Sequence, residues 1–218
     1  MRHLIDTYIE ADEPRKISPF DNMGLLELIV KTGIADAIAS QLGGLKGNRN
    51  AIAETIENNV RRKILKENLS DPAYYEKMSA LLDEIIAARK ARAIEYEEYL
   101  QRIAALAKRV EVGVAEDTPP QLRKSPGLRA LYNNLKTPGG PPRQPNRVSE
   151  TPAVYMSTGD PVLDKALKID AAVRLVRPDG WRGVQARELV IKAALYDVLR
   201  DPIEVDRIFL IIKAQREY

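Results

Sequence analysis

Few residues of this chain have the types and spacing that catalysis requires. A phosphate-binding loop needs glycines followed by Lys and then Ser or Thr. The segment Gly43-Gly44-Leu45-Lys46-Gly47 is rich in glycine, but no Gly-Lys-Ser/Thr occurs anywhere in the sequence. Metal-dependent nucleases hold a divalent ion between carboxylates beside a lysine, and here no lysine has an acidic residue two positions upstream. Asp83-Glu84 lies within a helical pattern rather than at the end of a buried strand. We therefore predict that this chain is not itself an enzyme.

Cysteine and histidine chemistry is almost absent from the sequence, which has no cysteine and the single histidine His3. Disulfides, thiolate metal sites and cysteine nucleophiles are thereby excluded. Catalytic triads and histidine metal clusters are excluded in the same way. We expect no cofactor and no metal ion in this chain, and His3 is interpreted as a surface or packing residue.

Composition describes an ordinary helical protein with a mild basic excess. The 218 residues are 44% hydrophobic and 30% charged, and 34 basic residues face 31 acidic ones for a net charge of +3. This balance favours polyanions only slightly. No apolar run approaches the roughly 18 residues that span a bilayer, so we expect no membrane association and a cytoplasmic location.

Apolar residues recur at helical spacing, whereas the alternating pattern of strands is nearly absent. The sequence therefore predicts an all-α fold. Asp71-Pro72, Asp160-Pro161 and Asp201-Pro202 each combine an N-cap with a first-turn proline and mark helix starts. The predicted helices are 4–9, 25–30, 34–42, 50–67, one from 71 to the join at 89–93, one from there to 110, and 125–135, 160–176, 185–199 and 201–218.

Proline and glycine residues divide the chain into three parts. Residues 1–112 are predicted to form an N-terminal helical bundle, and 161–218 a C-terminal helical unit. Residues 113–160 hold most of the 14 prolines and are interpreted as a connector, helical only at 125–135. The two helical parts form either separate units or one domain.

Two successive helices carry polar residues that packing does not require. Asn58 and Asn59 are unfavourable in the middle of a helix, so a hydrogen-bonding task across helices is expected. Tyr75 and Glu76 fall outside the apolar stripe of their helix. These four residues are the candidates for contact with a partner protein.

Aromatic residues elsewhere are interpreted as packing residues. Tyr96 and Tyr99 fit the apolar period of their helix and are assigned to the core. Trp181 lies between two glycines and is expected to fill the turn between the last helices.

A basic stripe is the candidate contact for a DNA backbone. Its lysines and arginines could touch phosphates, but Glu57, Glu67 and Glu84 lie at spacings that would pair with them on a solvated face. The sequence favours the paired face and leaves both readings open. The residues of the stripe are Arg61, Arg62, Lys63, Arg89, Lys90 and Arg92.

Several segments, in order along nearly the whole chain, resemble the C-terminal helical region of the motor (R) subunits of type I restriction–modification enzymes. The likeness is least in 113–155. The segments are 2–9, 18–23, Glu57-Asn58-Asn59-Val60-Arg61-Arg62-Lys63, Asp71-Pro72-Ala73-Tyr74-Tyr75-Glu76-Lys77-Met78, Ile94-Glu95-Tyr96-Glu97-Glu98-Tyr99-Leu100, Pro178-Asp179-Gly180-Trp181-Arg182-Gly183 and 212–218.

The resemblance implies a part of a larger machine. The parent subunit of that family is a type I site-specific deoxyribonuclease with ATP-dependent translocation, whose nuclease and translocase domains lie upstream. ATP and Mg²⁺ are implied only for that parent, and no catalytic residue carries over to this chain. The implied role is assembly: docking the motor onto the methyltransferase and specificity subunits, with DNA contact as a further option.

Two readings of the chain remain open at this stage. The first is the assembly part of a restriction motor subunit, in which case Met1 is an internal methionine or the start of a fragment. The second is a free-standing helical DNA-binding or regulatory protein. The codons upstream of Met1 distinguish them, because only the first reading places translocase motifs there.

Overall fold

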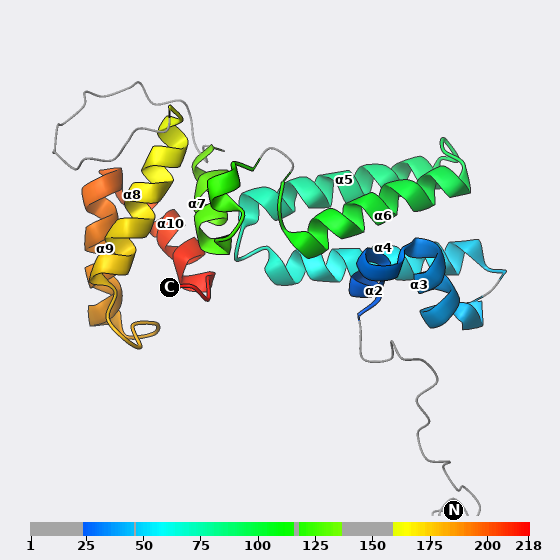
Figure 1. The fold of residues 1–218 in the computed structure, drawn as a ribbon, viewed down its shortest axis with the longest axis horizontal. Coiled ribbons are helices and arrows are strands. Elements are labelled where there is room, and N and C mark those ends of the chain that lie inside the picture. The colour runs from blue at the N-terminus through cyan, green and yellow to red at the C-terminus, as the bar shows by residue number, and fades with distance from the viewer. Residues whose placement is uncertain (1–23, 46, 116–117, 137–158) are drawn as a thin grey trace, which may run out of the picture.

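The computed structural model describes residues 24–45, 47–115, 118–136 and 159–218 (Figure 1). Within these residues it contains nine α-helices and no strand, which confirms the predicted all-α fold. His3 and the helix predicted at 4–9 lie outside the described residues. The elements are α2 (Leu25–Thr32), α3 (Ile34–Gln41), η1 (Gly43–Leu45), α4 (Arg49–Glu67), α5 (Pro72–Lys90), α6 (Tyr96–Val112), η2 (Pro120–Leu122), α7 (Pro126–Lys136), α8 (Pro161–Val176), α9 (Gln185–Leu199) and α10 (Pro202–Ala214).

All three predicted Asp-Pro starts begin a helix. The Asp71 side chain accepts a hydrogen bond from the amide of Tyr74, and Asp201 accepts one from Ile203. Asp160 accepts from two first-turn amides of α8. Each proline supplies a fixed φ at a position whose N–H would have no helical partner. The start of α5, α8 and α10 is therefore set locally by two adjacent residues.

Helices α2 to α6 form an N-terminal lobe (right in Figure 1). The predicted apolar row of α4 is buried, with Ile56 and Val60 fully inaccessible to solvent. Helices α5 and α6 form the expected hairpin, although the join has no glycine or proline. Arg92 makes the reversal possible by adopting a left-handed conformation with φ of 54°.

Helices α7 to α10 and the short η2 form a C-terminal lobe with its own core (left in Figure 1). Leu122 and Leu131 are fully buried in that core. This differs from the predicted connector at 113–160, because residues from Leu122 to Lys136 are an integral part of the lobe; residues 137–158 lie outside the described ones. Trp181 packs as predicted: it is buried near Phe209, and its indole N–H donates to the main-chain oxygen of Tyr218 at 2.8 Å.

A buried ion pair ties α4, α5 and α6 together. Arg89 contacts both carboxylate oxygens of Glu57, at 2.8 and 3.1 Å, and the two side chains are only 13% and 7% exposed. The hydroxyl of Tyr99, which is fully buried, reaches the same carboxylate at 3.1 Å. The polar atoms of this core are thus paired with one another, as burial requires.

In the described residues, no helix has the length and apolar character needed to cross a membrane.

Removing one partner of the buried Arg89–Glu57 pair should lower the free energy of unfolding much more than removing one partner of an exposed pair. In Arg89→Met, the carboxylate of Glu57 stays buried without a positive charge, and we expect the free energy of unfolding to fall by about 3 kcal/mol. Urea unfolding followed by circular dichroism measures this difference.

Lys31→Met is the matched control, since Lys31 and Glu27 form a pair whose side chains are 58% and 44% exposed. Its loss should cost less than about 1 kcal/mol. Equal losses in the two variants would contradict the role assigned to the buried pair.

Candidate functional site

The two lobes meet where the N-terminus of α5 contacts α7, and Asp71 is the centre of this contact. Its carboxylate accepts a hydrogen bond from the side-chain amide of Asn133 at 2.7 Å and one from Asn134 at 2.8 Å. The same group caps α5 through the amide of Tyr74 at 3.3 Å. A helix start in one lobe is thereby joined to a helix in the other.

Asn134 uses its whole amide in this contact. Its side-chain oxygen accepts from the amide of Ala73 at 3.3 Å, and its nitrogen donates to Asp71 and to the carbonyl of Ala130 at 2.8 Å. The residue is 2% exposed. A buried amide with every group satisfied fixes one relative position of α5 and α7.

Helix α10 and the residue that follows it also support the contact. The side chain of Gln215 donates to the carbonyl of Ser70, immediately before Asp71, at 2.5 Å. Arg207 donates to the carbonyl of Asn134 at 3.0 Å. Three helices of two lobes therefore converge within a few residues of Asp71.

Burial dominates the electrostatics of this centre. Asp71 is buried, and the loss of solvent raises its pKa from 3.8, the value for an exposed aspartate, to about 6. Hydrogen bonds from Asn133, Tyr74 and Asn134, with the charge of Arg129, act in the opposite direction. Asp71 is therefore ionised at neutral pH, as its three N–H partners require, with its titration in the weakly acidic range.

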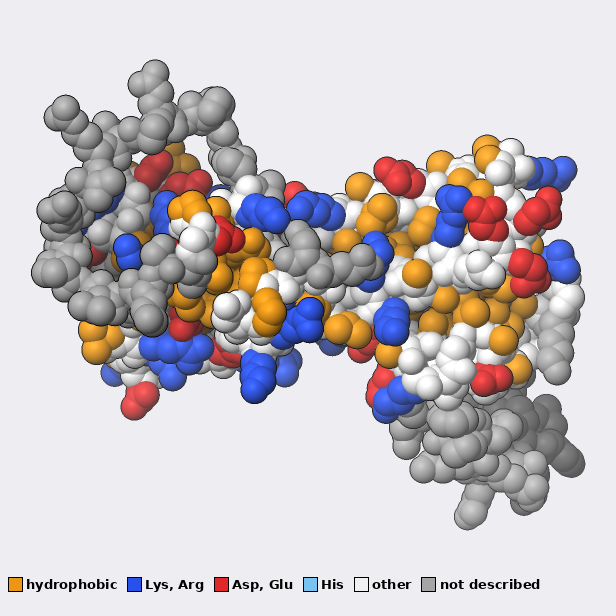
Figure 2. All heavy atoms as spheres, turned by 45° about the horizontal axis from the view of Figure 1, so that its top comes forward, with side chains coloured by type: hydrophobic (Ala, Val, Ile, Leu, Met, Phe, Trp, Pro, Cys, Tyr) orange, Lys and Arg blue, Asp and Glu red, His pale blue; other side chains and the backbone are white. Residues whose placement is uncertain are grey.

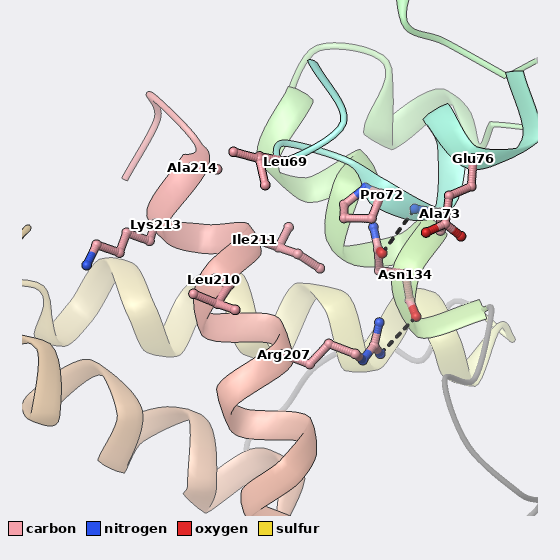
Figure 3. Close-up of a pocket in the computed structure, with 10 residues that line it drawn as sticks. All are labelled: Leu69, Pro72, Ala73, Glu76, Asn134, Arg207, Leu210, Ile211, Lys213 and Ala214. Atoms are coloured by element: carbon pink, nitrogen blue, oxygen red, sulfur yellow. Dashed lines mark hydrogen bonds between the residues drawn. The ribbon is translucent and has the colours of Figure 1, made fainter. Parts of the chain in front are cut away.

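An apolar cleft opens beside this centre, with a volume of about 530 Å³ (Figure 3). Leu69 and Pro72 line it from one side, and Leu210 and Ile211 of α10 line it from the other. Leu69 and Leu210 are 74% and 65% exposed. Both lobes thus contribute apolar side chains to one concave surface, here called the junction cleft.

The charged residues of the junction cleft differ in their pairing. Arg207 forms an ion pair with Glu204, and Lys213 forms one with Glu188, each at 2.7 Å. Glu76 is exposed, and no ion pair of Glu76 occurs among the described residues. The uncompensated charge at the rim is therefore negative.

The four predicted partner-contact residues occupy different environments. Glu76 lies at the rim of the junction cleft, and Asn58 is exposed on α4. Asn59 donates to the carbonyl of Thr55, one turn earlier in α4, so its hydrogen bond stays within the helix instead of crossing to another. Tyr75 is buried and packs edge-on against Tyr74, with ring centres 5.1 Å apart. The prediction of Tyr75 as a partner contact is corrected, because its side chain is buried in the core of the N-terminal lobe.

Half of the predicted basic stripe is paired with acids, and two of the three pairs lie at the surface, as the solvated-face reading expects. Arg61 contacts Asp83 at 2.7 Å, and Lys63 lies 3.6 Å from Glu67. Arg89 is held by Glu57 in the core. The other three members, Arg62, Lys90 and Arg92, are exposed.

Sequence reasoning missed the residues that build the centre. Asn133 and Asn134 are adjacent amides in the predicted helix 125–135, which is the same signal that drew attention to Asn58 and Asn59. Leu69 gave no signal, because nothing in the sequence distinguishes an exposed leucine in a turn from a packed one. The sequence also cannot show that α7 and α10 approach α5.

No protein-family model, curated protein or solved structure matched this chain when it was compared with them. Among the described residues, no group of three or more His, Cys, Asp or Glu side chains is placed to hold a metal ion. The arrangement around Asp71 holds helices together and exposes an apolar cleft.

Titration of Asp71 should make stability depend on pH in a defined direction. Between about pH 4 and pH 6 the folded protein binds a proton at Asp71 more tightly than the unfolded chain does, so the free energy of unfolding falls as pH rises through this window. The difference between 3.8 and about 6 corresponds to about 3 kcal/mol.

Asp71→Asn isolates this contribution, because all other groups are common to both proteins. The stability of the wild type relative to this variant should decrease by up to about 3 kcal/mol between pH 4 and pH 7. Urea unfolding at a series of pH values measures it. A relative stability that is constant with pH would show that Asp71 does not titrate in this range.

Proposed function

We propose that this chain is the helical assembly part of a type I restriction motor subunit and that its junction cleft docks onto the methyltransferase and specificity subunits. The observation that carries the proposal is the junction cleft, in which exposed leucines of both lobes line one concave surface. The order of the resembling segments supports the choice of this machine in the proposal. The proposed setting is the cytoplasm, where that machine works on DNA.

The cleft has the physical character of a protein-binding surface. Leu69 and Leu210 are largely exposed, and covering such a side chain is worth about 1.5–3 kcal/mol. Clustering of exposed apolar residues, rather than their mere presence, is what marks interaction sites. Ala73 and Ala214 add small side chains to the lining, which allows a partner backbone to approach closely.

Charge indicates the chemistry of the occupant. Arg207 and Lys213 are already neutralised within the chain, whereas Glu76 is not. We therefore expect an apolar helix or segment of the partner that carries a Lys or Arg opposite Glu76. Complementary charge of this kind sets orientation and specificity more than affinity.

Binding to the partner subunits should depend on the exposed leucines of the cleft. In the full-length motor subunit, Leu69→Glu combined with Leu210→Glu should weaken binding to the purified methyltransferase–specificity complex by about tenfold or more. Both residues are exposed, so the fold should survive the change. Biolayer interferometry or quantitative pull-down measures the affinity.

Leu175→Glu is the matched control, because Leu175 is 86% exposed on α8 and does not line the cleft. It should bind as the wild type does. Loss of affinity in the control equal to that in the double variant would remove the cleft from the interface. Failure of the full-length wild-type subunit to bind would overturn the proposed function as a whole.

A further inference from the structure

Helix α9 is apolar on two sides, and its own lobe covers one of them. Ile191, Leu195 and Leu199 are buried in the core of the C-terminal lobe. On the outer side, Leu189 and Tyr196 are 56% and 44% exposed. A helix that is apolar all round is normally covered all round. The outer side of α9 therefore has the composition of a contact surface.

Two ion pairs fix how α9 lies beside α10. Lys192 pairs with Asp206, and Lys213 pairs with Glu188, each at 2.7 Å. Because Glu188 precedes Lys192 in α9 whereas Lys213 follows Asp206 in α10, the two helices are antiparallel. Both lysine ammonium groups lie over the ring of Phe209, at 4.9 and 5.9 Å from its centre. The two ion pairs are therefore on the same side of the helix pair.

Exposed apolar residues of α9 and α10 lie level with one another along this side. One helical turn from the Lys192–Asp206 pair, Leu189 of α9 is level with Leu210 of α10. One turn in the other direction, Tyr196 is level with Ile203, which is 70% exposed. Spacings of three and four residues keep each set on one face of its helix. The resulting surface, here called the α9–α10 face, consists of Leu189, Lys192, Tyr196, Ile203, Asp206 and Leu210.

Exposed apolar residues of the N-terminal lobe are arranged differently. In Figure 2, hydrophobic side chains on that lobe lie among Lys, Arg, Asp and Glu side chains. Leu65 is 70% exposed on α4, with Lys66 next to it in sequence. Single exposed leucines of this kind are normal on protein surfaces. The α9–α10 face is distinguished by two apolar rungs, one from each end, around a central ion pair.

We propose that the α9–α10 face binds the same face of a second copy of this chain, around a two-fold axis that runs along the helices. This axis places α9 of one copy over α10 of the other. Lys192 then faces Asp206 of the second copy, Glu188 faces Lys213, and each apolar rung meets the rung at its own level. Every helix is antiparallel to its neighbours, as in an up-and-down four-helix bundle.

Charge selects this axis over the alternative. The other two-fold axis in the plane of the face runs across the helices and places α9 over α9. With the apolar rungs opposed, it brings Lys192 against Lys192 and Asp206 against Asp206, and such like-charge contacts are strongly unfavourable. A different protein would need its own copy of the pattern, whereas a second copy of this chain presents it by symmetry.

The shape of the molecule leaves room for the second copy. Helix α9 lies at the end of the C-terminal lobe that is farthest from the N-terminal lobe, and it runs across the long axis of the molecule (Figure 1). A two-fold rotation about an axis along α9 therefore directs the two N-terminal lobes away from each other. Leu210 also lines the junction cleft, whereas Leu189, Tyr196 and Ile203 do not. Self-association can thus be tested apart from docking.

The test is sedimentation velocity of the purified chain at concentrations from about 1 to 300 µM. Helix α9 has 15 residues and is about 22 Å long, so the contact is small and a Kd on the order of 10–100 µM is expected. Leu189→Glu combined with Ile203→Glu should raise the Kd by about tenfold or more, because it places charges in the covered face. Both residues are exposed, so the fold should survive the change.

Leu65→Glu combined with Leu175→Glu is the matched control, because it makes the same two changes at exposed positions of α4 and α8 outside the α9–α10 face. The control should associate as the wild type does. Equal weakening in both double variants would overturn the proposal. A wild type that remains monomeric over the whole concentration range would overturn it as well.

Charge reversal tests which residues face each other. Lys192→Glu alone makes the centre of the face acidic, and Asp206→Lys alone makes it basic, so each variant should be monomeric by itself. An equal mixture of the two should form a heterodimer, and a chain with both changes should associate as the wild type does. A mixture that stays monomeric would overturn the pairing.

Cysteine cross-linking distinguishes the two axes, because the chain has no cysteine of its own. A mixture of Tyr196→Cys and Ile203→Cys chains should form a disulfide-linked dimer under mild oxidation. Tyr196→Cys alone should cross-link much more slowly, since the proposed axis places the two copies of this residue over different helices. Equal cross-linking in both cases would overturn the axis. None of the changed residues lines the junction cleft, so these results do not bear on docking there.

Discussion

The carboxylate of Asp71 performs two tasks with the same pair of oxygen atoms. It caps α5 through the amide of Tyr74, and it accepts the side-chain amides of Asn133 and Asn134 from α7. A cap is normally a local device that stabilises its own helix. Here the cap also sets where the C-terminal lobe sits, because α7 is packed into the core of that lobe. The start of one helix and the placement of four others therefore depend on one buried charge.

A polar centre suits a joint between two cores better than an apolar one would. Each lobe already has its own buried cluster, so an apolar contact between them would gain area without selecting one alignment. Hydrogen bonds are directional, and an unpaired buried carboxylate is costly, so an arrangement without the asparagines is penalised. The raised pKa of Asp71 reflects the cost of burying this charge. In return for that cost, the hydrogen bonds of Asp71 select one alignment of the two lobes.

Local features of the fold were predictable from the sequence, whereas contacts between distant segments were not. The Asp-Pro starts of α5, α8 and α10 depend on neighbouring residues, and the apolar rows of α4 and α6 follow from helical periodicity. Tyr75 lies off the stripe of its own helix, and it is buried because another face of α5 is also covered.

At the candidate site, the sequence singled out Glu76 but not Leu69, because the surface opposite that leucine belongs to the other lobe. Asn58-Asn59 and Asn133-Asn134 look alike as patterns, and only the second pair meets a buried acid, which is 62 residues away from Asn133.

The junction cleft requires the alignment that Asp71 holds. It combines Leu69 and Glu76 on the α5 side with Leu210 on α10. Ala73, whose amide N–H donates to Asn134, also lines it. A shift of α7 along α5 would move the leucines of the two lobes apart. A ligand that contacts both lobes in this cleft would therefore favour the alignment that Asp71 holds, because a ligand stabilises the arrangement to which it binds most tightly.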